Sequence, residues 1–313
     1  MFIGTLLDEA IDGTLFMATE FITDRLRCVR QDLKIQRLPY IDSIPILEKC
    51  IRYHLYIRYL SVEFEDKAFD PVLNTQYLES YFQDLFSYYE DFNRSCNCLC
   101  NDQNELCNHC KLAKNIPEFQ SYYILLKCDK SQIVESCFYQ LYLSEQQGPQ
   151  CCSEVDGSFT AINIRCYIAS AASNPLRQAI KVILNKELHN YYRFFKLCKA
   201  LTFLQCCCLL DKFDLIRQMF LQQLNAAYSS SFSFPISKVE SWLEFDSTQE
   251  TVTFLENHGQ AVDMVKMSVK FSRKNKCDPV VPSIDNSTPL YHKFISLKLG
   301  PSMKHSDIIN GFL

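Results

Sequence analysis

Apolar residues recur at helical spacing through the first two thirds of the chain. Between Phe21 and Leu38 they follow steps of four, three and four positions, at Ile22, Leu26, Val29 and Leu33. This spacing places them on one stripe of an α-helix. Two later stretches show similar stripes, at Ile46, Cys50, Tyr53, His54 and Ile57 and at Leu78, Phe82, Leu85 and Tyr89. We therefore expect long helices from Leu6 to about Tyr228.

Short connectors between long helices are typical of stacked antiparallel helix pairs. The predicted fold class is mainly α: a helical-repeat solenoid over residues 1–228, a small module over residues 229–300 and a tail over 301–313. No fixed repeat period is found, so helix pairing alone supports the solenoid.

Two polar segments interrupt the helical pattern. Residues 93–111, "NRSCNCLCNDQNELCNHCK", are rich in Asn and Cys and predict an inserted surface loop. Residues 144–158 contain Gly148, Pro149 and Gly157, which break helices, and predict a second loop.

The C-terminal pattern after Tyr228 differs. Pro235 suits the start of a helix, the stretch Ser247–Glu250 has the form of a capping box, and Gly259 can end the second helix in a left-handed conformation. Residues 264–272 then alternate between the two faces of a half-buried strand. The expected inward residues are Val265, Met267, Val269 and Phe271, and the expected outward residues are Lys266, Ser268 and Lys270. Two helices followed by a strand predict a winged-helix module.

Composition narrows the classes of function. Glycine occurs only 7 times, which disfavours Gly-rich phosphate loops and doubly wound sheets. The formal net charge of −4 predicts no overall attraction to nucleic acid. Acidic residues interrupt the apolar N-terminal run, so no signal peptide is expected, and no stretch approaches the roughly eighteen apolar residues of a membrane span. The 17 cysteines are therefore expected to be reduced thiols inside the cell.

The cysteine-rich loop offers a candidate zinc site. Cys96, Cys98, Cys107 and Cys110 form C-x-C and C-x2-C pairs, and two such pairs can supply four tetrahedral ligands. The interval between the pairs is short for common zinc modules, and a fifth cysteine, Cys100, stays unused. A cysteine-biased insertion without metal is the alternative. No other cofactor is expected.

No group of residues predicts catalysis. The chain has no G-x-S-x-G, P-loop or G-x-G-x-x-G motif. His54 and His189 fall in predicted helices and are expected to be packed or capping residues. The spacing of Asp24 and Asp32, with arginines between them, favours ion pairs over an acid–base dyad. We expect no enzymatic activity.

One basic cluster is a candidate nucleic-acid site. It lies on the polar face of the predicted strand and just beyond it, where the wing of a winged helix would be: Lys266, Lys270, Arg273, Lys274 and Lys276. Such a wing can contact phosphates. A lysine-protected strand edge is an equally good interpretation.

The stretch "FITDRLRCVRQDLKIQ" resembles the signature F-x-x-D-R-x-R-x-(V/I)-R-x-D-hydrophobic-x-x-Q of the Sac-three/GANP domain. Its polar positions are Asp24, Arg25, Arg27, Arg30, Asp32 and Gln36. Further resemblances follow in order at Arg52–His54, at Glu118–Leu126, at Phe194 and Phe195, and in "IRQMFLQQLNAAY". The chain is most similar to short, stand-alone members of this family. The family's N-terminal Met-Cys-Pro segment is missing, as expected of a fragment or a late start, and residues 93–111 look like an insertion.

The resemblance implies a PCI-like helical solenoid ending in a winged helix: a non-enzymatic scaffold that pairs with a PCI-domain protein and a small acidic DSS-type subunit. The paired winged helices would bind RNA or DNA. The implied process is nuclear mRNA export; the alternative is centrosome duplication and mitotic progression. The implied locations are the nucleus, the cytoplasm, the centrosome and the spindle, with no membrane insertion. The charged signature residues are expected to hold neighbouring helices in register through semi-buried Asp–Arg pairs.

Overall fold

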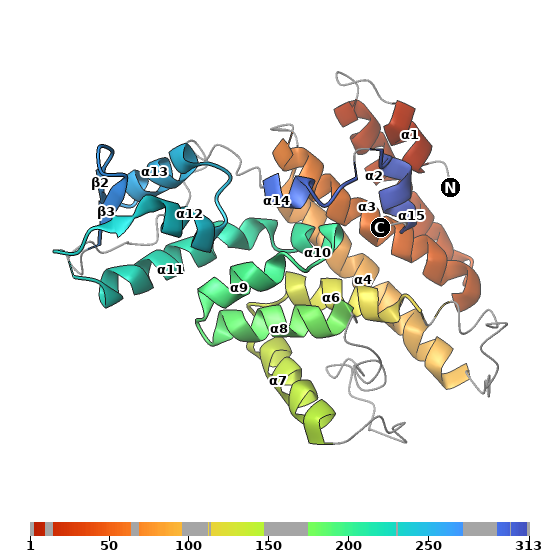
Figure 1. Ribbon diagram of the computed structural model, residues 1–313. Coiled ribbons are helices and arrows are strands. Elements are labelled where there is room, and N and C mark those ends of the chain that lie inside the picture. The colour runs from red at the N-terminus through yellow and green to blue at the C-terminus, as the bar shows by residue number, and fades with distance from the viewer. Residues whose placement is uncertain are drawn as a thin grey trace. The chain divides into compact units, whose positions relative to one another are not determined.

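Helices make up most of the described chain in the computed structural model (Figure 1). The structure describes residues 3–9, 15–63, 69–95, 112, 114–146, 175–229, 231–271, 293–300 and 302–311. The prediction of a mainly α fold is confirmed.

The chain divides into two compact units. The first holds Met1–Tyr123, Thr202–Cys207 and Leu299–Leu313, and the second holds Ile124–Leu201 and Cys208–Lys298. The second unit thus contains nearly all of the module predicted at residues 229–300, and the first contains the predicted tail.

Both predicted loops lie largely outside the described residues. Helix α4 (Pro71–Ser95) and helix α7 (Ser131–Gln146) extend into their first positions. The prediction that residues 93–95 and 144–146 are loop is therefore wrong, because each preceding helix continues by a few residues.

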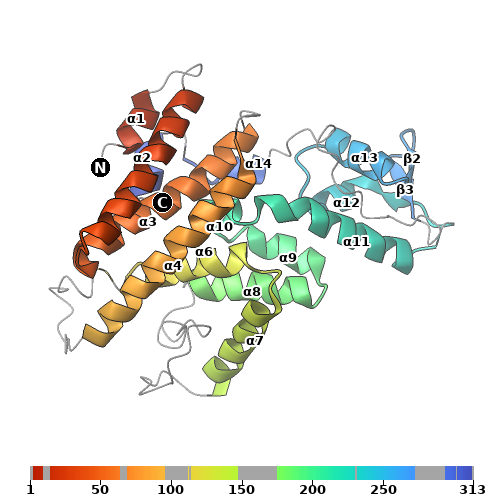
Figure 2. The ribbon, with the colours of Figure 1, turned by 180° about the vertical axis from the view of Figure 1, so that it is seen from behind.

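The first unit begins with α1 (Ile3–Glu9), α2 (Leu15–Ile35), α3 (Tyr40–Glu63) and α4. It also includes most of α6 (Ile116–Leu126), together with α10 (Phe203–Cys207) and α15 (His305–Asn310). Helices α2, α3 and α4 follow one another side by side (Figure 2). The stripe predicted on α2 is buried at Ile22, Leu26 and Leu33 and half-buried at Val29.

Helix α3 is buried on every side from Cys50 to Ile57, so its polar side chains need partners inside the unit. Arg52 donates to both carboxylate oxygens of Glu118 in α6, from Nε at 2.8 Å and from Nη2 at 2.9 Å. Glu48 accepts hydrogen bonds from the Tyr89 hydroxyl at 2.9 Å and from the Asn115 amide at 2.8 Å. Burial raises the pKa of Glu48.

His54 is buried in the same helix. Its Nδ1 lies 2.8 Å from Asn74 Oδ1, while the Asn74 amide donates to the His54 carbonyl at 3.1 Å. The two bonds orient the Asn74 oxygen as an acceptor, so His54 carries its proton on Nδ1. Its Nε2 has no hydrogen-bond partner among the described residues. Burial lowers the pKa of His54 from 6.5 to about 4.

This burial predicts a loss of stability in mild acid. Between pH 6.5 and 4 the unfolded chain takes up a proton on His54 that the folded chain excludes, so unfolding becomes easier as pH falls. We expect this residue to remove about 2 kcal/mol of unfolding free energy between pH 7 and pH 5. Urea titrations at the two pH values measure the loss. His54→Gln, which does not titrate, should lose less over the same interval, and an equal loss in both proteins would contradict the assignment.

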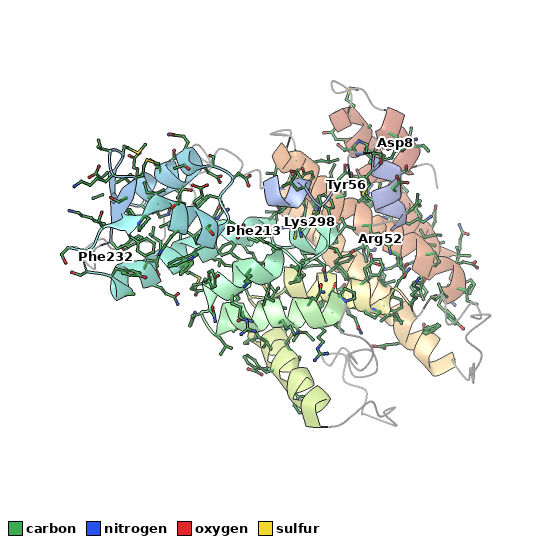
Figure 3. The ribbon with its side chains drawn as sticks, viewed as in Figure 1. Asp8, Arg52, Tyr56, Phe213, Phe232 and Lys298 are labelled. Atoms are coloured by element: carbon green, nitrogen blue, oxygen red, sulfur yellow. The ribbon has the colours of Figure 1, made fainter. Side chains whose placement is uncertain are left out.

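Helix α15 packs against α1 and α3. The Tyr56 hydroxyl of α3 lies 2.6 Å from His305 Nδ1, and the Ser306 N–H donates to the Asp8 carboxylate of α1 at 3.3 Å. Figure 3 shows Asp8 and Tyr56 on the two helices that receive α15. Two polar contacts therefore fix the start of the helix.

Two glycines allow this close approach. A Cβ at Gly4 of α1 would lie 2.5 Å from Ser306 Cα. Gly311 ends α15 with φ +83°, and a Cβ there would lie 2.8 Å from Arg52 Cζ. A larger residue at Gly4 would require the backbone at Ser306 to shift, and one at Gly311 would displace the Arg52 guanidinium. Gly311 also supplies the left-handed conformation.

The second unit contains α7, α8 (Pro175–Glu187), α9 (Tyr191–Cys198), the short η2 (Leu210–Lys212) and α11 (Phe213–Ala227). Helices α8 and α9 lie side by side (Figure 1). The Asn190 side chain accepts the Arg193 N–H at 3.2 Å and thereby caps α9. Phe194, Phe195 and Phe213 pack with ring centroids 5.2 to 6.3 Å apart and form the core between α9 and α11.

The C-terminal part of this unit contains β1 (Phe234–Pro235), α12 (Ile236–Leu243), α13 (Thr248–Asn257), β2 (Ala261–Asp263) and β3 (Ser268–Lys270). The strands form an antiparallel sheet in the order β1-β3-β2, in which Val269 pairs with Phe234 on one side and with Val262 on the other. Helix α14 (Lys293–Ser296) follows, and Lys298 beyond it donates to the Lys199 and Leu201 carbonyls, each at 2.7 Å (Figure 3).

The predicted helix ends are largely confirmed. Ser247 Oγ accepts the Glu250 N–H at 3.1 Å, as in a capping box, but the Glu250 carboxylate bonds to the Asp246 N–H, one residue earlier than the motif requires. Gly259 ends α13 with φ +69°, as predicted. No helix in the described ranges is long and apolar enough to cross a membrane.

Candidate partner and nucleic-acid interface

The strand predicted at residues 264–272 is shorter than expected. Met264–Met267 instead form a turn between β2 and β3. The Asp263 carboxylate accepts the Lys266 N–H at 3.0 Å, and Met267 has φ +47°. This local hydrogen bond competes with strand pairing and reverses the chain. The alternation of Val, Met and Lys did not reveal it, although an Asp before the turn is a typical signal.

The faces of this segment change accordingly. Val269 and Phe271 are buried, as predicted. Val265 and Met267 were expected inside, but Val265 is 95% exposed at the turn and Met267 is also exposed. Ser268 was expected outside, but it is buried and its hydroxyl accepts a hydrogen bond from Ser233 at 2.7 Å.

The basic cluster is only partly described. Lys266 lies in the turn, with its Nζ 3.9 Å from the Asp263 carboxylate, and Lys270 lies exposed in β3. The expectation that both share one strand face is therefore wrong, because Lys266 is not in the strand. Arg273, Lys274 and Lys276 lie outside the described residues.

The turn also presents an apolar tip, which we did not predict. Met264, Val265 and Met267 are all exposed there. Exposed apolar groups gathered at one place mark a candidate surface for binding another protein.

The junction between α11 and α12 depends on a fully buried arginine. Arg217 donates to the Leu243 carbonyl from Nε at 3.0 Å and to the Glu244 carbonyl from Nη2 at 2.8 Å. Its guanidinium also lies 3.5 Å from the Asp214 carboxylate and 4.1 Å from the centre of the Phe245 ring. Glu244 adopts a left-handed conformation at the end of α12. The last carbonyls of a helix have no partner within it, and Arg217 donates hydrogen bonds to them here.

Sequence reasoning missed Arg217. A signal was present, because Arg217 lies among the apolar positions Phe213, Ile216 and Phe220 of one helix face. A charge within an apolar stripe indicates a buried ion that must find partners.

The charged signature residues of α2 separate into two groups. Arg30 reaches Asp84 of α4 at 2.6 Å, and Lys34 reaches the same carboxylate at 2.8 Å. These contacts join neighbouring helices, as expected of Arg30.

The other group lies on the outside. Arg25 and Arg27 bind Asp24 of the same helix at 2.7 Å and 3.5 Å, and the Arg27 side chain is 51% exposed. The Arg25 guanidinium lowers the pKa of Asp24. The expectation that these residues form semi-buried pairs between helices is wrong, because the buried stripe of α2 directs them to solvent. Asp32 and Gln36 are exposed as well.

The predicted zinc ligands do not fall in the described ranges. Cys96, Cys98, Cys107 and Cys110 lie outside those ranges, so the zinc prediction stays a prediction. Among the described residues, no group of three or more His, Cys, Asp or Glu could hold a metal ion.

The predicted roles of the remaining cysteines and histidines have mixed outcomes. Cys206, Cys207 and Cys208 are buried and pack as small hydrophobic residues. His54 is packed, as predicted. His189 lies in a turn after α8 with φ +54°, not in a helix, and its Nδ1 is 2.8 Å from the Tyr191 hydroxyl.

The amino-acid sequence of this chain is similar to those of known proteins. The model of the SAC3/GANP family matches residues 3–264. SAC3 family protein B of Arabidopsis thaliana is 24% identical over 82% of this chain and 14% of its own length. Protein xmas of Drosophila melanogaster is 25% identical over 78% of this chain and 10% of its own length. SAC3 family protein 1 of Schizosaccharomyces pombe is 26% identical over 93% of this chain and 26% of its own length.

The matched region thus spans between a tenth and about a quarter of these relatives. The family match, in contrast, covers most of this chain and contains α2, the Arg52–Glu118 contact and β2. The chain belongs to the SAC3/GANP family.

Proposed function

We propose that this chain is a non-enzymatic scaffold that pairs with a PCI-domain protein and a small acidic DSS-type subunit in nuclear mRNA export. Its membership of the SAC3/GANP family supports a scaffold of this kind. The paired helices of the described chain are compatible with a PCI-like solenoid.

We infer further that α11 to β3 form a winged helix. The order of elements supports this inference: a helix, a short strand, two helices and a hairpin, with the sheet order β1-β3-β2. In this interpretation the turn Met264–Met267 is the wing.

The apolar tip of the wing is the observation that favours a protein partner. Val265 is 95% exposed between Met264 and Met267, and these side chains gain from burial against another protein. The turn contains one lysine, Lys266, whose Nζ lies 3.9 Å from the Asp263 carboxylate. The negative charge of Asp263 weakens the attraction between Lys266 and a phosphate. A protein partner at the tip and nucleic acid beside it would use different residues.

Substituting Val265 tests the partner contact. Val265→Glu should weaken binding to the PCI-domain partner by at least about tenfold, because a carboxylate would be buried at the contact. The melting temperature should stay unchanged, since the residue is exposed. Titration calorimetry with the purified PCI-domain protein and its DSS-type subunit measures the affinity. Unchanged affinity would contradict a partner site at this tip.

A matched charge variant separates nucleic-acid binding from partner binding. Lys270, Arg273 and Lys274 replaced together by Glu should keep the partner but lower RNA affinity and the salt dependence of RNA binding in the assembled complex. If RNA binding does not change, the lysines protect a strand edge. Locating the protein in interphase and mitotic cells distinguishes mRNA export, which predicts the nucleus, from the alternative centrosome role.

A further inference from the structure

Helix α2 carries a second apolar stripe, on the face turned away from the core. Met17 is 73% exposed, Phe21 is 56% exposed and Ile35 is 78% exposed. Cys28 lies on the same face and is half-buried, whereas every other cysteine in the described ranges is buried. The buried stripe of Ile22, Leu26 and Leu33 already accounts for the packing of α2 within its own unit, so the outer stripe has no role in that core.

The outer stripe has the spacing of a coiled-coil seam. Steps of four and three positions alternate through six residues: Met17, Phe21, Asp24, Cys28, Gln31 and Ile35. This is the heptad pattern of a helix that packs along a second helix. At 1.5 Å per residue the seam is about 27 Å long. The polar residues Asp24 and Gln31 interrupt it, and such interruptions fix register at a cost in stability.

The charges beside the seam fit a second copy of the same helix. One flank carries Glu20, Arg27 and Lys34, the other carries Arg25 and Asp32, and all five residues are exposed. Phe21 and Cys28 occupy the a positions of the heptad, so the residues just before them occupy the g positions. In a parallel pair, a g residue faces the e residue five positions later in the other helix. Glu20 would face the partner's Arg25, and Arg27 would face the partner's Asp32. Both pairs are attractive, and two-fold symmetry doubles them.

The opposite orientation is disfavoured by the same residues. In an antiparallel pair, equivalent flanks face each other. Arg25 would then face the partner's Arg25, and Arg27 would face the partner's Arg27. These two like-charge pairs repel and offset the attraction of Glu20 for the partner's Lys34. Every flanking pair named above for the parallel arrangement is attractive, so the charge pattern favours the parallel arrangement.

We propose that two copies of this chain associate through α2 as a parallel, in-register, two-stranded coiled coil of about three heptads. Phe21, Cys28 and Ile35 each meet the same residue across the two-fold axis. Asp24 keeps its bonds to Arg25 and Arg27 within each chain. Because two of the six seam positions are polar, the dimer is weak and depends on protein concentration.

The first experiment measures mass against concentration. In sedimentation velocity of the full chain, the mass should rise from 36.5 kDa toward twice that value as concentration increases. Phe21→Glu should weaken dimerisation by at least about tenfold, because it places two carboxylates at one seam layer. Val72→Glu on α4, also an exposed apolar position, is the matched control and should dimerise like the parent. Circular dichroism checks that each variant keeps its helices.

The second experiment tests orientation and register. Arg27→Glu should weaken the dimer, since it would face the partner's Asp32, and adding Asp32→Arg in the same chain should restore it. A short bismaleimide should cross-link Cys28 to the partner's Cys28, and mass spectrometry of tryptic peptides identifies that link. A mass of 36.5 kDa at every concentration, a dimer insensitive to Phe21→Glu, or no rescue by Asp32→Arg would each overturn the proposal. So would binding of another protein's helix to α2 by a chain that remains monomeric.

Discussion

Replacing Arg217 by Ala is expected to lower the free energy of unfolding by about 3–5 kcal/mol. The side chain is fully buried and donates to the Leu243 and Glu244 carbonyls at the end of α12. Its removal leaves these acceptors without their donor and leaves the Asp214 and Glu250 carboxylates without the cation that lies 3.5 Å and 3.8 Å away. Urea unfolding at neutral pH, followed by circular dichroism, measures the loss.

Two further variants show that the effect belongs to the buried site. Arg193→Ala on α9 removes an exposed arginine and should change stability by no more than about 0.5 kcal/mol. Arg217→Lys keeps the charge but cannot hold two carbonyls in one plane, so it should fall between Ala and the parent. A loss below about 1 kcal/mol in Arg217→Ala would show that the junction does not depend on this residue.

Replacing Arg52 by Ala is expected to cost about 3–5 kcal/mol as well. Arg52 is buried in α3 and makes two hydrogen bonds to the Glu118 carboxylate, which also accepts the Tyr122 hydroxyl at 2.8 Å. Without Arg52, the partly buried Glu118 carboxylate loses both hydrogen bonds from the guanidinium. The guanidinium also lies next to Gly311 at the end of α15, so its loss leaves a gap there and hydrogen exchange in α15 should become faster.

A double-mutant cycle separates the pair from the packing. Glu118→Ala alone should also destabilise the protein, because it removes the carboxylate that accepts both hydrogen bonds from the buried Arg52 guanidinium. The double variant Arg52→Ala with Glu118→Ala should lose less than the sum of the two single losses. Simple additivity would mean that the two side chains act independently, against the bidentate contact seen between α3 and α6.

Local features of the fold were predictable from the sequence because they depend on nearby residues. The stripe Ile22–Leu33, the cap at Ser247 and the left-handed Gly259 are each decided within one helix or one turn. Helix α3 was harder, because it is buried on all sides and its inward polar residues do not follow a simple stripe. The contact between Arg52 and Glu118 joins residues 66 positions apart, and no spacing rule gives such a distance.

The candidate interface shows the same limit. Alternating Val, Met and Lys predicted a strand through residue 265, but the Asp263 side chain turns the chain there by one hydrogen bond. The exposed tip followed from that turn and could not be deduced from alternation. For α2, the charges were evident in the sequence, but only the three-dimensional structure shows that Arg30 reaches Asp84 while Arg25 and Arg27 stay outside.

The packing of α15 against α1 and α3 has a consequence for the newborn chain on the ribosome. The Tyr56 hydroxyl cannot make its contact with His305 until that residue, 249 positions later, has been synthesised. The second unit, Ile124–Leu201 and Cys208–Lys298, is complete before α15 has been made. Translation therefore completes the second unit before the first, although the first unit begins earlier in the chain. Helices α1 and α3 stay without α15 throughout the synthesis of the second unit. During that interval the surface around Gly4, Asp8 and Tyr56 is exposed and can bind chaperones. Helix α15 covers this surface once it has been synthesised.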